Sequence, residues 1–178
     1  MRKLCLAFLF VALANAPAQA CEASAFIANV GNAFLSAARS HSAAAFSGVA
    51  ARYTDLNSIA MFALGPNRKL LSKSQEAEYM SLTRGFIGRF MAKNSSSLSG
   101  GNLKVLGCSG PNTAMTVNTQ MSNGKKVMFK VYKTRRGYLV RDVNVSSVWL
   151  AQQLRSNFTG VIRRNNGRIS ALFEYLGS

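Results

Sequence analysis

The spacing of apolar residues changes twice along this chain, and this change limits the folds that the chain can adopt. Over residues 22–93 apolar side chains recur about every four positions, over 103–145 they alternate, and from 147 the longer spacing returns. A period near four is typical of amphipathic helices, and alternation is typical of half-buried strands. The sequence therefore predicts helices, then a sheet, then helices, which is an α+β fold.

Local signals set the expected boundaries of these elements. Residues 22–53 are predicted to be helical, and Asp55 can cap a short helix over 56–64. Ser72 and Gln75 have capping-box spacing and open a longer helix that ends near residue 93. Helical spacing over 147–164 and around 169–176 predicts two C-terminal helices.

The alternating region is predicted to form a four-stranded antiparallel meander. Its segments are joined by short connections, and Ser122-Asn123-Gly124 is a strong hairpin signal. Because strands joined by short turns pair with their neighbours, we expect a curved sheet with the helices packed on one face.

Residues 1–20 have the pattern of a secretory signal peptide. Arg2 and Lys3 precede an apolar run over 4–14, and Ala18-Gln19-Ala20 is a typical cleavage sequence. Cleavage after Ala20 would leave residues 21–178 as a single exported domain. No later stretch of the sequence is long and apolar enough to span a bilayer.

Two of the three cysteines, Cys21 and Cys108, remain after this cleavage. In an oxidising compartment such a pair favours a disulfide. Acylation of Cys21, as in a lipoprotein, is an alternative, although Ala18 stands where lipoprotein signals usually have Leu. Two free thiols are the third possibility.

The chain is strongly basic, with a formal charge of +16. Without Arg2 and Lys3, 20 basic residues face 6 acidic residues, a net charge of +14. The basic pairs 125–126, 135–136 and 163–164 fall at separate element ends, whereas nucleic-acid binders gather such charge on one surface. We therefore expect no nucleic-acid partner, and favour anionic lipid headgroups or an acidic protein.

Few residues are suited to catalysis or metal binding. His41 is the only histidine and lies in no nucleophile motif, so we expect it to have a surface or capping role. One histidine and two distant cysteines make no metal-ligand cluster, and no glycine-rich phosphate loop is present. We predict a protein that is not an enzyme and has no cofactor or metal.

Three segments near the C-terminus carry a family resemblance. Tyr138 to Val145, Ser147 to Leu150 and Leu154 to Phe158 follow a pattern close to W-x-V-x-D-V-x-V-x-G-V-S-L and then Y-R-S-Q-F. In order and spacing they resemble the MlaC family of periplasmic phospholipid-binding proteins, and Asp55 to Gly65 is similar to an earlier family segment. The chain departs from the pattern at several positions, including Ser147 in place of Gly and Trp149 in place of Ser.

The resemblance implies a cystatin-like α+β fold that encloses an apolar cavity for acyl chains. It implies a monomeric periplasmic carrier that moves phospholipid, or a related membrane lipid, between an inner-membrane ABC lipid transporter complex and an outer-membrane lipoprotein complex. The implied lipid-binding wall consists of Phe86, Phe90, Met115, Val117, Val127, Phe129, Val131, Trp149 and Phe158. Asp142 and Arg155 are expected to form an ion pair with a structural role.

Two alternatives remain open at this level. The same apolar residues could form an ordinary packed core, because a sequence pattern does not distinguish a filled interior from a hollow one. In that case the protein would be an exported basic module that docks on an acidic partner without lipid cargo.

Overall fold

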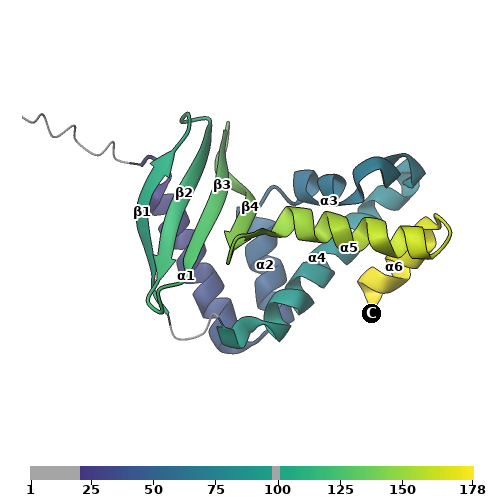
Figure 1. Cartoon of the computed structure of the whole chain (residues 1–178), viewed down its shortest axis with the longest axis horizontal. Helices are drawn as coiled ribbons and strands as arrows, with labels where there is room; N and C mark the ends of the chain where they lie inside the picture. The colour runs from purple at the N-terminus through teal and green to yellow at the C-terminus, as the bar shows by residue number, and fades with distance from the viewer. Residues whose placement is uncertain (1–20, 98–100) are drawn as a thin grey trace, which may run out of the picture.

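The computed structural model describes residues 21–97 and 101–178 (Figure 1). The predicted signal peptide, residues 1–20, lies outside the described residues. The N-terminal helices are α1 (Ser24–Ser40), α2 (Ala43–Tyr53), α3 (Leu56–Leu64) and α4 (Glu76–Lys93), with the 3-10 turns η1 (Gly65–Leu70), η2 (Lys73–Gln75) and η3 (Ser95–Ser97). The strands are β1 (Leu103–Ser109), β2 (Ala114–Met121), β3 (Lys126–Thr134), β4 (Gly137–Val145) and β5 (Val148–Trp149), and the chain ends with α5 (Leu150–Arg164) and α6 (Ile169–Gly177). The predicted α+β class is confirmed.

The sheet is an antiparallel meander in the order β1-β2-β3-β4-β5. It has one short strand more than the four that were predicted. Ser146 and Ser147 both adopt left-handed backbone conformations, with φ of 52° and 68°, and reverse the chain after β4. Because such a turn matches the twist of paired strands, Val148 and Trp149 pair with the end of β4 before α5 begins.

The predicted helix over 22–53 is divided into α1 and α2 at His41. The backbone of His41 is left-handed, with φ of 50°, and the Ser42 side chain caps α2 by accepting from the backbone N–H of Ala45 at 3.2 Å. His41 Nδ1 lies 2.7 Å from Ser95 Oγ, and this hydroxyl donates to the carbonyl of Ala92. His41 is therefore the donor, and it ties the α1–α2 junction to the end of α4.

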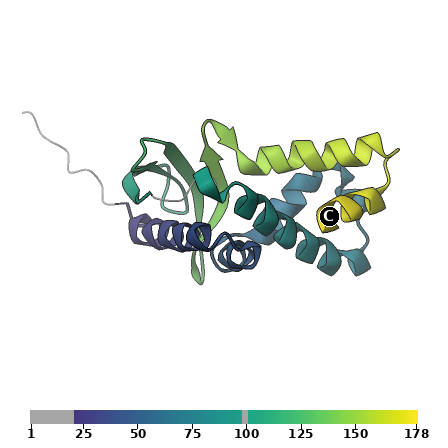
Figure 2. The same cartoon turned by 90° about the horizontal axis from the view of Figure 1, so that it is seen from below.

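Three hydrophobic clusters of buried residues organise the described part of the molecule, and Figure 2 shows its elements arranged from α1 beside the sheet to α6 at the other end. Helix α1 lies against the inner face of the sheet, where Ile27 and Val30 pack on Val117 and Val131. Helices α3, α4, α5 and α6, hereafter the helical lobe, bury a second cluster that includes Tyr79 and is separate from the sheet. None of the helices in the described part of the chain is long and apolar enough to cross a membrane.

Helix α2 packs closely against α4. A Cβ atom at Gly88 would overlap the side chain of Ser47 and the carbonyl of Ala43, both on α2. The missing side chain therefore permits the close approach of the two helices.

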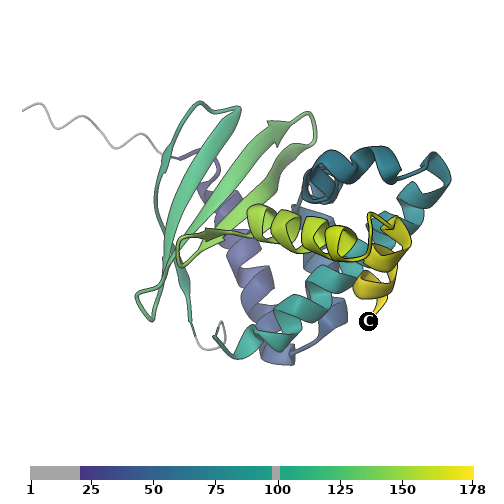
Figure 3. The same ribbon diagram turned by 45° about the vertical axis from the view of Figure 1, so that its right-hand side comes forward.

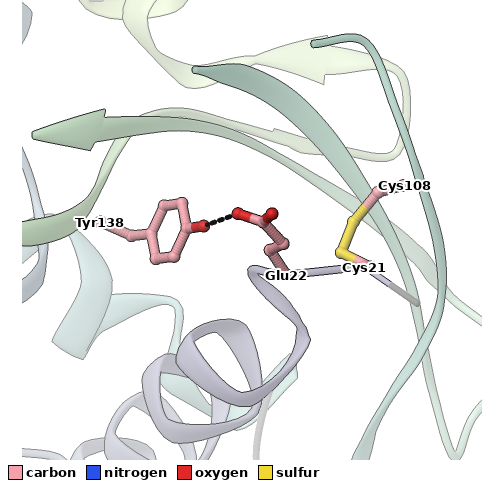
Figure 4. Close-up of a disulfide and its surroundings, with 4 residues drawn as sticks. All are labelled: Cys21, Glu22, Cys108 and Tyr138. Atoms are coloured by element: carbon pink, nitrogen blue, oxygen red, sulfur yellow. Dashed lines mark hydrogen bonds between the residues drawn. A yellow bond between two sulfur atoms is a disulfide. The ribbon is translucent and has the colours of Figure 1, made fainter. Parts of the chain in front are cut away.

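The N-terminal end of the described chain is fastened to the sheet (Figure 4). Cys21 and Cys108 form a disulfide with a Cα–Cα distance of 5.5 Å. Of the three alternatives for these cysteines, the structure has the disulfide. Beside it, Glu22 accepts hydrogen bonds from Lys133 Nζ at 3.0 Å and from Tyr138 Oη at 2.8 Å.

These contacts change the ionisation of the residues that make them. The hydrogen bonds from Lys133 and Tyr138 lower the pKa of Glu22 below its ordinary value. The same carboxylate raises the pKa of Lys133 and of Tyr138. At neutral pH the cluster is thus an ion pair with an additional phenol donor, and it joins the start of α1 to β3 and β4.

Candidate functional site

An apolar cavity of about 160 Å³ lies between the inner face of the sheet and the helices α4 and α5. The strands, α4 and α5 contribute most of the apolar side chains that line it: Val127, Phe129, Val143 and Val145; Phe86, Ile87, Phe90 and Met91; Leu150, Ala151 and Leu154. Gly31, Phe34 and Leu35 of α1 complete its base. The cavity thus lies between the cluster that α1 forms with the sheet and the cluster of the helical lobe.

The sheet wall follows from strand alternation. Val127 and Phe129 of β3 point inward with Val143 and Val145 of β4, because Phe129 pairs with Val143 and Val127 with Val145. Val127 and Phe129 belong to the cluster that α1 forms with the sheet, and Val143 and Val145 pack against it, so these four side chains border both this cluster and the cavity.

The helix wall is aromatic and opens to solvent. Phe86 and Phe90 lie one turn apart on α4, and their rings stack with centroids 6.4 Å apart. Phe90 is 42% exposed although it lines the cavity, and Gln153 on α5 is an exposed lining residue as well. These exposed lining residues place the mouth of the cavity between the C-terminal half of α4 and the first turns of α5.

Asp142 fixes α5 to the sheet. Its Oδ1 accepts from the backbone N–H groups of Val143 and Ala151, each at 2.9 Å. Ala151 lies in the first turn of α5, and the residue before this helix, Trp149, has no acceptor side chain. Asp142 thus supplies the missing cap from the neighbouring strand.

The expected ion pair between Asp142 and Arg155 is wrong. The two ion pairs among the described residues are Lys133–Glu22 and Arg141–Asp55. The guanidinium of Arg155 instead lies 5.0 Å from the centroid of the Phe62 ring on α3.

A second polar link joins the helical lobe to the sheet at the far end of the cavity. Asp55 caps α3 as predicted, and its Oδ2 accepts from Arg141 Nε at 2.8 Å. Burial alone raises the pKa of Asp55, but the hydrogen bonds from Ser58 and Arg141 outweigh burial and leave it below its ordinary value. The pair is therefore ionised at neutral pH and holds α3 against β4.

The structure brings four of the nine predicted wall residues to the cavity: Phe86, Phe90, Val127 and Phe129. The other five lie elsewhere: Met115, Val117 and Val131 are buried beneath α1, Phe158 is buried in the helical lobe, and Trp149 lies on the outer face of the sheet. For four of these five residues another element decides the outcome, because α1 covers the three strand residues and Phe86 covers Phe158.

Trp149 is the clearest misplacement. It pairs with Asn144, which pairs with Met128 on the face opposite Val127 and Phe129. Lys130 Nζ lies 4.4 Å from the centroid of the Trp149 ring, in a cation–π contact on that outer face.

Sequence reasoning missed the lining residues of β4 and α5. Val143 and Val145 alternate in the predicted strand, and Leu150 and Leu154 lie four residues apart in the predicted helix. These signals mark the residues as inward-facing, but they do not show which of them another element leaves uncovered.

The chemistry that this arrangement offers is the burial of apolar chains. Among the described residues no group of three or more His, Cys, Asp or Glu side chains could hold a metal ion. The fold and the cavity together define the class as a binding protein with a site for an apolar ligand.

A comparison with family models identifies the family more closely. The model described as MlaC protein matches residues 24–178, so the chain belongs to the MlaC family. Members of this family are periplasmic lipid carriers and not enzymes, in agreement with the predicted class.

The solved structures agree with this assignment. The phospholipid-binding protein from Ralstonia solanacearum, solved in complex with a phospholipid, is similar with a TM-score of 0.73 and 16% sequence identity. The match covers 86% of this chain and 94% of that chain, and at this identity it establishes the fold. A comparison with curated proteins finds no match.

Proposed function

We propose that this chain is a phospholipid carrier of the periplasm, in which the cavity between the sheet and α4–α5 takes up acyl chains. The observation that carries the proposal is the apolar lining of this cavity together with its mouth at Phe90. Family membership and the phospholipid bound by the Ralstonia relative support the same ligand class.

The physical need for such a carrier is large. Exposure of about thirty methylene groups to water costs on the order of 20 kcal/mol, at roughly 0.8 kcal/mol for each group. A protein that covers the tails removes most of this cost and leaves the headgroup in water.

The cavity must widen to hold a whole lipid. Its volume of about 160 Å³ is close to the roughly 150 Å³ of a cavity that binds benzene. Uptake of acyl chains therefore requires α4 and α5 to separate further from the sheet, at the mouth beside Phe90.

Location and partners form part of the proposal. Residues 21–178 would act as a single exported domain after removal of 1–20, and the Cys21–Cys108 disulfide suits an oxidising compartment. The carrier would act as a monomer and pass lipid between an inner-membrane ABC transporter complex and an outer-membrane lipoprotein complex.

Lipid extraction followed by mass spectrometry tests the proposal. Protein purified without detergent is expected to carry phospholipid, and Val143→Trp, which fills the cavity, is expected to carry much less. Thr116→Trp is the matched control, since Thr116 lies on the outer face of the sheet, and it should keep its lipid. A wild-type protein that carries no lipid and takes up none when it is offered contradicts the proposal and favours a basic docking module without cargo.

A further inference from the structure

The mouth of the cavity is flanked by exposed basic and apolar side chains. Phe90 and Val148 are 42% and 46% exposed. Lys93, Lys125 and Lys126 are exposed as well, and none of them is in an ion pair of the described part of the chain. We call these five residues the mouth rim.

The topology of the sheet and of α4 places the rim residues at one side of the molecule. Lys93 follows Phe90 by three residues on α4, so both lie on one face of that helix. Lys125 ends the β2–β3 turn, and Lys126 begins β3 at the same end of the sheet where Val127 and Val145 line the cavity, with its side chain on the outer face because it alternates with Val127. Figures 1 and 3 show the C-terminal end of α4 and this turn on the same lower side.

The acidic residues of the described chain lie away from this side. Glu76 and Glu78 are at the opposite end of α4 from Lys93, about 25 Å away at 1.5 Å for each helical residue. Glu22 is bound to Lys133, which is about 23 Å along β3 from Lys126. Both separations exceed the Debye length of about 8 Å at physiological ionic strength.

The three remaining acids are also unavailable to the rim lysines. Asp55 is paired with Arg141, Asp142 is hydrogen-bonded to the first turn of α5, and Glu174 lies on α6 in the helical lobe. The mouth rim is therefore a positively charged surface without compensating acidic partners.

We infer that the mouth rim docks the protein on the surface of an anionic phospholipid bilayer. Lysines are attracted to anionic headgroups, and exposed apolar side chains between them enter the interface between headgroups and acyl chains. An acidic protein surface would satisfy the lysines but gives no role to the exposed Phe90 and Val148. This inference rests on the proposed function, because docking at the mouth would let acyl chains enter the cavity without crossing water.

Sedimentation with vesicles tests this docking. The wild-type protein is expected to bind vesicles of phosphatidylcholine mixed with phosphatidylglycerol, to bind pure phosphatidylcholine much less, and to dissociate as salt is added. Each lysine near an anionic surface contributes about a fivefold change in partitioning. The triple variant Lys93→Gln, Lys125→Gln, Lys126→Gln should therefore bind the mixed vesicles about 100-fold more weakly.

A matched variant separates the rim from net charge. Lys69→Gln, Lys73→Gln, Arg163→Gln removes three charges from exposed positions of the helical lobe and its η turns, and should change binding by no more than a few-fold. Equal losses in the two triple variants would overturn the inference. So would a wild-type protein that does not bind the mixed vesicles, and an acidic protein would then be the better partner for the rim.

Bound phospholipid, measured by extraction from the same preparations, distinguishes this inference from the proposed function. The rim variant is expected to keep its cargo while it loses vesicle binding. Loss of vesicle binding with cargo intact supports docking at the rim, whereas a wild-type protein without cargo contradicts the carrier function alone.

Discussion

Replacement of Asp142 tests how α5 is held over the cavity. Asp142→Ala removes the acceptor for the N–H groups of Val143 and Ala151. Loss of a helix cap costs about 1 kcal/mol, the lost attraction between carboxylate and helix dipole about 0.5 kcal/mol, and the second hydrogen bond about 1 kcal/mol. The free energy of unfolding should therefore fall by about 2–3 kcal/mol.

Asp142→Asn is the matched control. Its amide oxygen can still accept from Ala151, but the negative charge at the helix N-terminus is gone, so we expect a loss of about 1 kcal/mol. Urea unfolding followed by circular dichroism measures both variants, and an unchanged slope against urea shows that the unfolded state is comparable.

A double-mutant cycle between Asp142 and Arg155 gives the decisive comparison. The structure has no contact between these two charges, so the effects of Asp142→Ala and Arg155→Ala should add to within about 0.5 kcal/mol. A coupling energy above about 1 kcal/mol would show that they form an ion pair and would refute this account of how α5 is fixed.

Three further predictions concern packing, the disulfide and pH. Gly88→Ala should destabilise the protein by about 1–3 kcal/mol, because the α2–α4 contact leaves no room for a methyl group. Gly48→Ala, whose new Cβ atom would meet no atom within 4 Å, should stabilise it by about 0.5–1 kcal/mol. Thermal unfolding measures both variants, and equal effects would contradict the packing argument. Replacement of both Cys21 and Cys108 by Ser should cost at most about 4.6 kcal/mol, the loop entropy for a separation of 87 residues, and an unchanged midpoint in urea would contradict it. The lowered pKa of Glu22 predicts that the wild type is more stable than Glu22→Gln at pH 7, and that this difference starts to shrink below the ordinary value of 4.5 and is lost as the pH falls through the lowered pKa of the folded state; a difference in melting temperature that does not shrink at all below pH 4.5 would oppose it.

Prediction from sequence succeeded where neighbouring residues decide the structure. The capping box at Ser72 and Gln75 and the cap at Asp55 are both present, because each depends on residues within one helical turn. The fifth strand, β5, was not predicted because a strand of two residues is too short to show an alternating pattern. The left-handed backbone of Ser146 and Ser147, which creates that strand, has no glycine to signal it.

Prediction of the site was limited by contacts between distant segments. Val117 and Phe129 lie on the same inner face of adjacent strands and have the same alternating pattern. Both are buried in the cluster that α1 forms with the sheet, but only Phe129 also borders the cavity, and this depends on how the helices cross the sheet. The predicted partner of Asp142, Arg155, was also wrong. The sequence shows that a carboxylate is present at this position, but it does not show whether this carboxylate pairs with an arginine or caps a helix.

The sequence by itself determined the order and type of the elements, the positive charge and the pair of cysteines available for a disulfide. These follow from local periodicity and composition, which each segment carries independently of its neighbours. Only the tertiary structure decided that α1 covers part of the sheet, that α4 and α5 lie over another part of it, and that a cavity remains between these helices and the sheet. The physical reason is that alternation marks which side chains leave water, whereas the packing of distant elements decides whether they meet other side chains or a cavity.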